Sequence, residues 1–383
     1  MRAVLRALRH PERAYDSIVV AGTNGKGSTS ATLSSILVES GYATGLYTSP
    51  HLVDIRERWM INGRKIEPDL LERSIEILRR GVARSGITPT YFEALTLIAF
   101  IAFREARCEV AVLEVGMGGR LDATNVVRPI AALITSIGLD HTEFLGRTPR
   151  KIAAEKAGII HRGAIVLTSN TDSPVVDVIR RRAEKFGNRF VTVDGEHPTP
   201  LAGDFQRRNV ALAVRAAEEL RPILPRITPE SIARGAAQTC WRGRLERIAI
   251  DGKAIWIDGF HNGHAAAAIA PFIEQNLPPP RLLVFGIMRD KHIEEVAKRL
   301  FPLFERIIAT EPYPPRSAAA ADLAALARGQ GVEAIAEPDP ARAFARALRS
   351  PQRSILIGGS LYLAGAAIDY FDSQREQSDH NHD

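Results

Sequence analysis

A glycine-rich stretch near the start of the chain carries residue types that bind phosphate: Gly22, Thr23, Asn24, Gly25, Lys26, Gly27 and Ser28. The apolar run before it predicts a buried strand over 17–21, and the residues after it predict a helix over 28–40. A loop between a strand and a helix presents backbone N–H groups that bind anions, and its lysine can reach the terminal phosphates of a nucleotide. Because Gly27 stands where a hydroxyl usually follows the lysine, we expect Ser28 to ligate Mg²⁺.

Two further groups that can bind a metal follow predicted strands. Glu114 ends the apolar run 110–113, and Asp140 and His141 follow the apolar run 130–137. Open α/β sheets bind ligands at the carboxyl ends of their strands, and Mg²⁺ prefers oxygen ligands. A strand-capping carboxylate is the alternative for Glu114, and a structural histidine is an equal alternative for His141.

These groups need a parallel sheet to position them. Strands are predicted over 17–21, 43–47, 110–113, 130–137 and 164–169, and helices over 28–40, 90–106, 149–157 and 204–220. Fully apolar strands that alternate with helices are typical of a sheet covered on both faces. We therefore predict an α/β fold, with a P-loop central domain built on a mostly parallel sheet.

The pattern starts afresh after residue 244. Strands are predicted over 254–257, 282–285, 306–309 and 354–357, with alanine-rich or amphipathic helices between them. This indicates a smaller C-terminal α/β domain of Rossmann-like type. We expect the domains to span 1–247 and 248–373, and the polar residues 374–383 to form a disordered tail.

Composition excludes several classes of protein. The 383 residues are 45% hydrophobic and 25% charged, which is typical of a globular protein in water, and no apolar run is long enough to span a membrane. The net charge of +6 comes from scattered arginines that do not interleave with aromatic residues, so we expect no nucleic-acid partner. The two cysteines, Cys108 and Cys240, need no disulfide, and no signal peptide is evident, so we expect a cytoplasmic protein.

Taken together, these segments resemble the folylpolyglutamate synthase/dihydrofolate synthase family of the Mur ligase superfamily. The stretches that carry the resemblance are 20–28, 48–52, 90–93, 113–125, 135–141 and 155–159, with weaker matches at 209, 243–246, 258–264, 290–291 and 359–360. The resemblance implies that ATP phosphorylates a substrate carboxylate and that the amine of L-glutamate attacks the acyl phosphate. The implied partners are small molecules (ATP, glutamate, and a folate or dihydropteroate), and we expect a monomer.

The resemblance also implies roles for single residues. Two Mg²⁺ ions would be held by Ser28, Glu114, His141 and a carbamylated Lys156, a lysine that the sequence alone would place on a helix surface. Lys26, His141 and Lys156 would be catalytic. The nucleotide would be bound by Thr23, Asn24, Gly25, Lys26, Gly27, Ser28, Asn209, Arg244 and Asp258. The acceptor substrate would lie near Ser49, Thr90, Tyr91, Phe92, Glu93, Leu121 and Asp122, where aromatic rings suit a flat pterin, although helix-start packing also explains Tyr91 and Phe92. His261 and Ser360 would bind the incoming glutamate.

Two departures from the family pattern affect the expected substrates. Family members usually show Asp-x-Ala-His-Asn-Pro where this chain has Phe260 and Gly263 in place of the alanine and proline, so the turn is expected to differ in shape. Only residues 1–16 precede the first predicted strand, where family members that bind dihydropteroate use an additional loop. We therefore expect glutamate addition to folates, with dihydropteroate as the second acceptor. The alternatives are another amino-acid ligase of the superfamily and a P-loop switch that binds nucleotide without forming a product.

Overall fold

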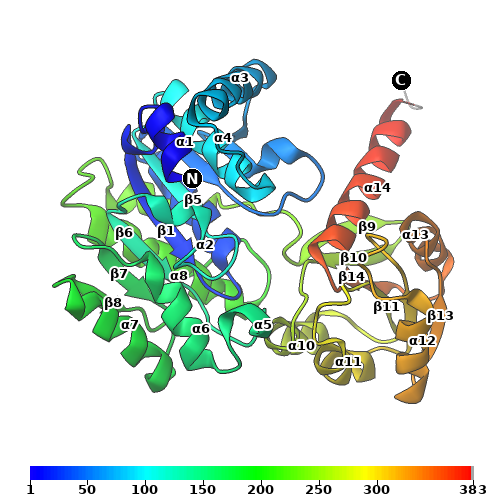
Figure 1. The fold of residues 1–383 in the computed structure, drawn as a ribbon. Helices are drawn as coiled ribbons and strands as arrows, with labels where there is room; N and C mark the ends of the chain where they lie inside the picture. Colours follow the sequence, from blue (N-terminus) through cyan, green and yellow to red (C-terminus); the bar gives the residue numbers. More distant parts are fainter. Residues whose placement is uncertain (381–383) are drawn as a thin grey trace. The chain divides into compact units, whose positions relative to one another are not determined.

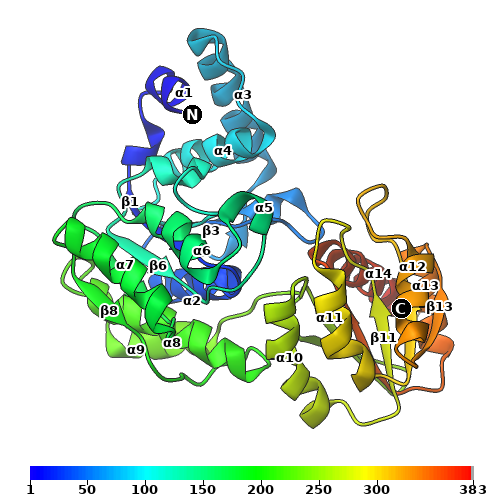
Figure 2. The same cartoon turned by 60° about the horizontal axis from the view of Figure 1, so that its bottom comes forward.

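The computed structural model describes residues 1–380 and divides into two compact units. Unit 1 comprises residues 1–51, 55–200 and 206–241, and unit 2 comprises residues 52–54, 201–205 and 242 onwards. None of the helices in the described part of the chain combines the length and the apolar composition needed to cross a lipid bilayer. Figures 1 and 2 show the elements of each unit.

An eight-stranded sheet forms the centre of unit 1, in the order β4-β3-β2-β5-β1-β6-β7-β8. The strands are β1 (Asp16–Ala21), β2 (Thr44–Tyr47), β3 (Trp59–Ile61), β4 (Arg64–Lys65), β5 (Val110–Glu114), β6 (Ala131–Ile134), β7 (Ile165–Thr168) and β8 (Phe190–Thr192). All adjacent pairs are parallel except β2 with β3 and β3 with β4. The first strand of the chain thus lies between β5 and β6, so the loop that follows β1 emerges between the ends of two parallel neighbours.

Helices cover both faces of this sheet. They are α1 (Arg2–Ala7), α2 (Lys26–Glu39), α3 (Pro68–Ser85), α4 (Tyr91–Glu105), α5 (Thr142–Leu145), α6 (Pro149–Lys156), α7 (Ser173–Lys185), α8 (Asp204–Leu220) and α9 (Pro229–Ala237), with 3-10 turns at Pro11–Arg13, Ile55–Arg58, Ala123–Val126 and Ala157–Ile159. Alternate residues of β1 point to opposite faces, and Val19 and Ala21 join a core with residues of α4, α6 and α7. Helix α2 packs against α9 as well as against β1, β2 and β5.

Unit 2 is a six-stranded sheet in the order β13-β12-β11-β14-β10-β9. Its strands are β9 (Glu246–Ile250), β10 (Lys253–Asp258), β11 (Arg281–Phe285), β12 (Arg306–Ala309), β13 (Glu333–Ala336) and β14 (Ser354–Gly358), and its helices are α10 (Gly263–Asn276), α11 (Ile293–Leu300), α12 (Ala320–Gly329), α13 (Pro340–Arg349) and α14 (Leu361–His380), with a 3-10 turn at Phe301–Leu303. Only β9 is antiparallel to its neighbour. One core joins the sheet to α10, α11 and α12, and a second joins it to α13 and α14.

The predicted fold class is confirmed: both units are α/β, and both sheets are mostly parallel. The strand predicted over 130–137 is shorter, because residues 135–138 leave the sheet and bind the glycine-rich loop instead. The chain passes for the last time from unit 1 to unit 2 between Trp241 and Arg242, whereas we predicted a domain boundary between residues 247 and 248. The boundary lies earlier because β9 pairs with β10 and therefore belongs to unit 2 from its first residue.

The predicted disordered tail, residues 374–383, is helical up to His380, because α14 continues from a first half that is packed in the core of unit 2. Residues 381–383 of that tail lie outside the described residues.

Candidate active site

The glycine-rich loop connects β1 to α2 and depends on two glycines. Gly25 has φ = 87° at the N-cap of α2, and a Cβ there would lie 2.2 Å from Asn209 Oδ1. A Cβ on Gly22 would lie 1.7 Å from Thr135 Oγ1. The loop therefore approaches its neighbours more closely than any side chain allows, and the left-handed φ at Gly25 favours glycine as well.

Lys26 folds back over this loop. Its Nζ donates to the carbonyl oxygens of Gly22 at 3.2 Å and Thr23 at 3.1 Å. The first backbone N–H groups of α2 have no acceptor within the helix, and they carry the positive end of the helix dipole. The loop thus combines a cation with unpaired donors, which is the arrangement that binds a phosphate chain.

The segment after β6 fixes the loop from one side. Thr135 Oγ1 donates to Asn24 O at 2.7 Å, and Ser136 Oγ donates to the same oxygen at 3.2 Å. Thr23 donates its backbone N–H to Ser136 O at 2.8 Å. Thr135 and Ser136 lie within a stretch that carries the resemblance, but no role was predicted for them. A pair of hydroxyl residues directly after an apolar strand is the signal that could have indicated one.

Glu114 lies on the other side of the loop. It is the last residue of β5, is buried, and pairs in register with Val20 of β1, next to the point where the loop begins. Its Oε2 accepts the backbone N–H of Ser49 at 3.3 Å. Ser28, in the first turn of α2, is also buried. The strand order explains why a carboxylate and a hydroxyl far apart in sequence both border the loop.

His141 is the N-cap of α5, with φ = 48°. Its backbone N–H donates to Asp140 Oδ1 at 2.9 Å, and its Nε2 lies 3.9 Å from the same oxygen. Asp140 is buried, so it can orient the imidazole. Within residues 1–380 no three histidine, cysteine or carboxylate side chains are grouped in a way that could hold a metal by themselves.

Lys156 does not lie on a helix surface, so that expectation from the sequence alone was wrong. It ends α6, is 4% exposed, and donates from Nζ to Gly22 O at 2.7 Å. Burial, reinforced by the nearby charge of Lys26, lowers the pKa of Lys156 from 10.5 to about 7. Gly22 O therefore accepts from both lysines, and both amines lie at the start of the phosphate loop.

The residues predicted near the acceptor substrate surround the segment after β5. Asp122 Oδ2 accepts the backbone N–H groups of Gly116 and Met117, both at 3.1 Å, and its Oδ1 accepts from Thr124. Burial raises the pKa of Asp122, and these hydrogen bonds oppose the rise. Asp122 thus holds the shape of the segment, while the neighbouring Leu121 is 81% exposed.

Thr90 and Glu93 form a capping box at the start of α4, with Thr90 Oγ1 accepting from Glu93 N and Glu93 Oε2 accepting from Thr90 N. Phe92 is partly buried and packs against the core: a Cβ on Gly116 would lie 2.4 Å from its ring, and its ring centroid is 6.3 Å from that of Tyr47. Tyr91 is 66% exposed. Phe92 thus packs at the start of the helix, and Tyr91 is the more exposed of the two aromatic side chains.

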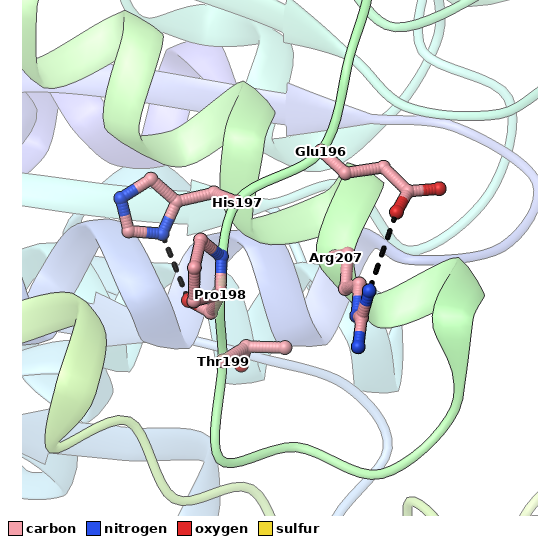
Figure 3. A pocket seen from close by; sticks show the side chains of 5 residues that line it. All are labelled: Glu196, His197, Pro198, Thr199 and Arg207. Carbon is pink, nitrogen blue, oxygen red and sulfur yellow. Dashed lines mark hydrogen bonds and ion pairs between the residues drawn. The ribbon is translucent and has the colours of Figure 1, made fainter.

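Asn209 lies on α8 and contacts the loop directly. Its carbonyl accepts from Thr29 Oγ1 at 3.2 Å, and its Nδ2 donates to Gln206 Oε1 at 2.9 Å. A small pocket is lined by Arg207 of the same helix and by residues 196–199, which precede the helix. Figure 3 shows its lining residues, Glu196, His197, Pro198, Thr199 and Arg207. Arg207 and Glu196 form an ion pair at 3.7 Å across it.

Four predicted site residues belong to unit 2. Asp258 ends β10 and is buried; its carboxylate accepts the backbone N–H groups of Leu245 at 2.9 Å and Phe260 at 2.8 Å. Burial raises the pKa of Asp258, and the charge of Arg244 opposes the rise. His261 Nδ1 lies 2.9 Å from Gly259 O, and Ser360 Oγ accepts from Leu363 N at the start of α14.

The two departures from the family pattern have structural explanations. The Phe260 ring is buried and stacks on Phe285, and a Cβ on Gly358 would lie 2.3 Å from it. Gly263 opens α10, where a Cβ would lie 2.7 Å from Glu295 Oε2. The turn after β10 is thus fitted to its own unit, with glycines opposite the larger side chains.

Two family models match the chain. The Mur ligase middle domain matches residues 20–214, and the glutamate ligase domain of Mur ligases matches residues 243–361. The chain therefore belongs to the Mur ligase family.

Similar proteins define its place within that family. The chain is 33% identical to the dihydrofolate synthase/folylpolyglutamate synthase of Bacillus subtilis, over 94% of this chain and 92% of the relative. It is also 33% identical to the enzyme of the same name from Escherichia coli, over 93% and 86%. Within the Mur ligases it is thus a member of the dihydrofolate synthase/folylpolyglutamate synthase group, as the sequence motifs predicted.

Solved structures agree. Folylpolyglutamate synthase of Mycobacterium tuberculosis, complexed with ADP and AMPPCP, has a TM-score of 0.89 and 28% identity, over 97% of this chain and 94% of that one. The Escherichia coli enzyme in complex with DHPP and ADP has a TM-score of 0.87 and 29% identity, over 98% and 93%.

Proposed function

We propose that this protein is an ATP-dependent ligase that adds L-glutamate to a folate, with dihydropteroate as a second acceptor. The observation that carries the proposal is the phosphate loop between Glu114 and the segment 135–141, with two lysine amines at Gly22 O. The kinship with dihydrofolate synthase/folylpolyglutamate synthases supports the choice of substrates.

The reaction has two steps. A carboxylate oxygen of the acceptor attacks the γ-phosphorus of ATP, and ADP leaves with the electron pair of the broken P–O bond. The amine of glutamate then attacks the acyl carbon, the C–O bond to phosphate breaks, and the amine loses a proton as the amide forms. Both steps depend mainly on positioning and on charge neutralisation. Lys26 supplies a cation at the loop, and the N-terminus of α2 supplies backbone donors.

The residues around the loop suit Mg²⁺. A nucleotide-bound Mg²⁺ is held by one or two carboxylates together with phosphate oxygens and water, so it needs no cluster of three acidic groups. Glu114 and Ser28 provide a buried carboxylate and a hydroxyl at the loop, and His141 provides an imidazole next to Asp140. When bound, the ions neutralise charge on the phosphates. We assign Ser28, Glu114, His141 and carbamylated Lys156 as the residues that would hold two such ions.

Carbamylation of Lys156 is supported by the position of its amine. The amine is buried at Gly22 O, and no carboxylate of the described residues forms an ion pair with it. A buried ammonium without an oppositely charged partner is costly, whereas the charge of a carbamate next to a divalent cation is compensated. Mass spectrometry of the intact protein under bicarbonate, compared with Lys156→Met, tests this assignment.

The remaining predicted site residues are assigned to ligands separately for each unit. In unit 1, Tyr91, Leu121 and the segment shaped by Asp122 would contact the acceptor, and Asn209 the nucleotide. In unit 2, Arg244 and Asp258 would contact the nucleotide, and His261 and Ser360 the glutamate. We expect the enzyme to act as a monomer in the cytoplasm, where its two unpaired cysteines stay reduced.

A product assay tests the proposal. The protein is incubated with ATP, glutamate, and either tetrahydrofolate or dihydropteroate, and products are identified by mass spectrometry. We expect a mass increase of one glutamyl residue and ADP formation that requires both acceptor and amino acid. Phosphate release that needs neither would indicate a nucleotide switch. A product from dihydropteroate alone would reverse the order of acceptors.

A further inference from the structure

Trp241 has no role in the function proposed above, yet it lies against the phosphate loop. Its Nε1 lies 2.7 Å from the point that a Cβ on Gly27 would occupy, and its Cε2 and Cζ2 lie 3.3 and 3.4 Å from that point. Both residues belong to unit 1. The indole therefore occupies the space next to the first turn of α2 that a side chain at position 27 would need.

This contact explains why position 27 is glycine. Gly27 lies within α2 and is not among the glycines with positive φ, so its backbone conformation is open to any residue. Glycine in a helix costs about 1 kcal/mol relative to alanine. Conformational freedom thus gives no reason for a glycine here, but the indole does. Gly27 and Trp241 form a complementary pair, which we call the Gly27–Trp241 pair.

The indole N–H is a donor without an acceptor in the described part of the chain. Trp241 makes no hydrogen bond within residues 1–380, and its side chain is half-buried. An indole nitrogen can only donate. This donor lies at the N-terminus of α2, where backbone N–H groups and Lys26 already provide positive potential. A phosphate oxygen is the acceptor that such a group of donors suits.

We propose that Trp241 is a nucleotide-binding residue whose indole N–H donates to a phosphate oxygen of ATP or ADP, and that Gly27 is required to leave room for the indole. The proposal rests on the nucleotide-binding part of the proposed function and needs neither glutamate nor a folate. It also explains why position 27, which usually carries a hydroxyl residue after the lysine of such a loop, is glycine here. The indole occupies the space that a side chain at this position would need.

Titration calorimetry of the full-length protein with ADP and Mg²⁺ tests the donor. Trp241→Phe keeps an aromatic ring against Gly27 and removes the N–H. A hydrogen bond to a charged group is typically strong enough that its loss weakens binding about tenfold or more. The matched control is Trp256→Phe in β10, whose ring packs edge-on against Phe272 at 4.9 Å and for which ADP affinity should not change. Equal ADP affinity of Trp241→Phe and the wild type would overturn the proposal.

A double-mutant comparison tests the pairing of the two residues. Gly27→Ala should weaken ADP binding because the new Cβ displaces the indole. In the Trp241→Ala background the same change has no ring to displace, so its effect should shrink at least about threefold. Thermal unfolding of each variant confirms that it is folded. Equal effects of Gly27→Ala in both backgrounds would overturn the pairing.

The outcomes separate this inference from the proposed function. A wild-type protein that binds ADP and shows the Trp241→Phe effect, but adds no glutamate, would refute the substrate assignment and leave the inference intact. A wild-type protein that binds no ADP would overturn both.

Discussion

The phosphate loop of unit 1 and the turn after β10 in unit 2 both follow parallel strands, but they are built in opposite ways. In the phosphate loop, hydroxyls of Thr135 and Ser136 hold a backbone carbonyl, and the N–H groups at the start of α2 have no acceptor within the helix. In the turn after β10, the carboxylate of Asp258 accepts the N–H groups of Leu245 and Phe260.

This difference separates binding from stability. The loop in unit 1 leaves donors for an anion, so substitutions there should reduce nucleotide affinity more than stability. In the turn of unit 2, the carboxylate of Asp258 accepts backbone N–H groups of its own unit. Substitutions there should therefore reduce stability along with any reduction in ATP affinity. Substitutions at Gly25, Lys156 and Asp258 test this contrast.

Gly25→Ala should have the largest effect. The new Cβ meets Asn209 Oδ1 at 2.2 Å, and φ = 87° disfavours alanine. Displacement of the loop should reduce ATP-dependent activity about 100-fold. The control is Gly41→Ala, which also has positive φ (75°) but no atom within 4 Å of the new Cβ, so it should lose a little stability and keep its activity. Similar activities of the two variants in steady-state assays would contradict the account.

Lys156→Ala should reduce activity by about 100-fold, because it removes a buried group at the phosphate loop. If the lysine acts as a carbamate, added short carboxylic acids should restore part of the activity to Lys156→Ala but not to Lys26→Ala. Unchanged turnover in Lys156→Ala would rule out the metal-ligand role assigned to this residue.

Asp258→Ala should destabilise the protein by about 2 kcal/mol, because it leaves two backbone N–H groups without their acceptor. Asp258→Asn retains one acceptor oxygen and should cost less. Urea unfolding measures both, and the Michaelis constant for ATP is measured in parallel. A large loss of ATP affinity in Asp258→Ala with no loss of stability would show that the turn resembles the phosphate loop after all.

The contribution of Lys156 to stability should depend on pH. Its pKa is about 7 in the folded protein and 10.5 without burial, so between these values the unfolded chain binds more protons. Its contribution to the free energy of unfolding should therefore rise with pH across this window, and below it the full cost of burying the ammonium remains. Urea unfolding of wild type and Lys156→Met in carbonate-free buffer should show wild-type stability rising relative to the variant. Parallel curves would contradict the lowered pKa.

The sequence predicted the strands and helices around the loop well, because their apolar runs are long and are bounded by glycines. It did not predict the burial of Lys156, because a lysine at the end of a short amphipathic helix has the same local pattern whether it faces solvent or a neighbouring loop. It also missed Trp241, whose contact with Gly27 spans 214 positions of the chain and leaves no periodic signal.

The shape of the turn after β10 also depends on contacts between distant residues, which the local sequence pattern does not reveal. Phe260 was expected to alter the turn, and the structure shows it buried against Phe285 and Gly358. Phe285 ends β11 and Gly358 ends β14. Only the packing of these two strand ends reveals that a glycine at position 358 makes room for the Phe260 ring. The substitution therefore changes the interior of unit 2, while Asp258 and His261 keep their backbone contacts.

Oxygen-isotope transfer tests whether the acceptor carboxylate is phosphorylated before the amide forms. The acceptor is prepared with ¹⁸O at both oxygens of the reacting carboxylate and incubated with ATP, Mg²⁺ and glutamate. If the carboxylate is phosphorylated before the amine attacks, one ¹⁸O atom should appear in inorganic phosphate for every amide formed. Phosphate that contains no ¹⁸O while the glutamyl product accumulates would contradict the acyl-phosphate mechanism.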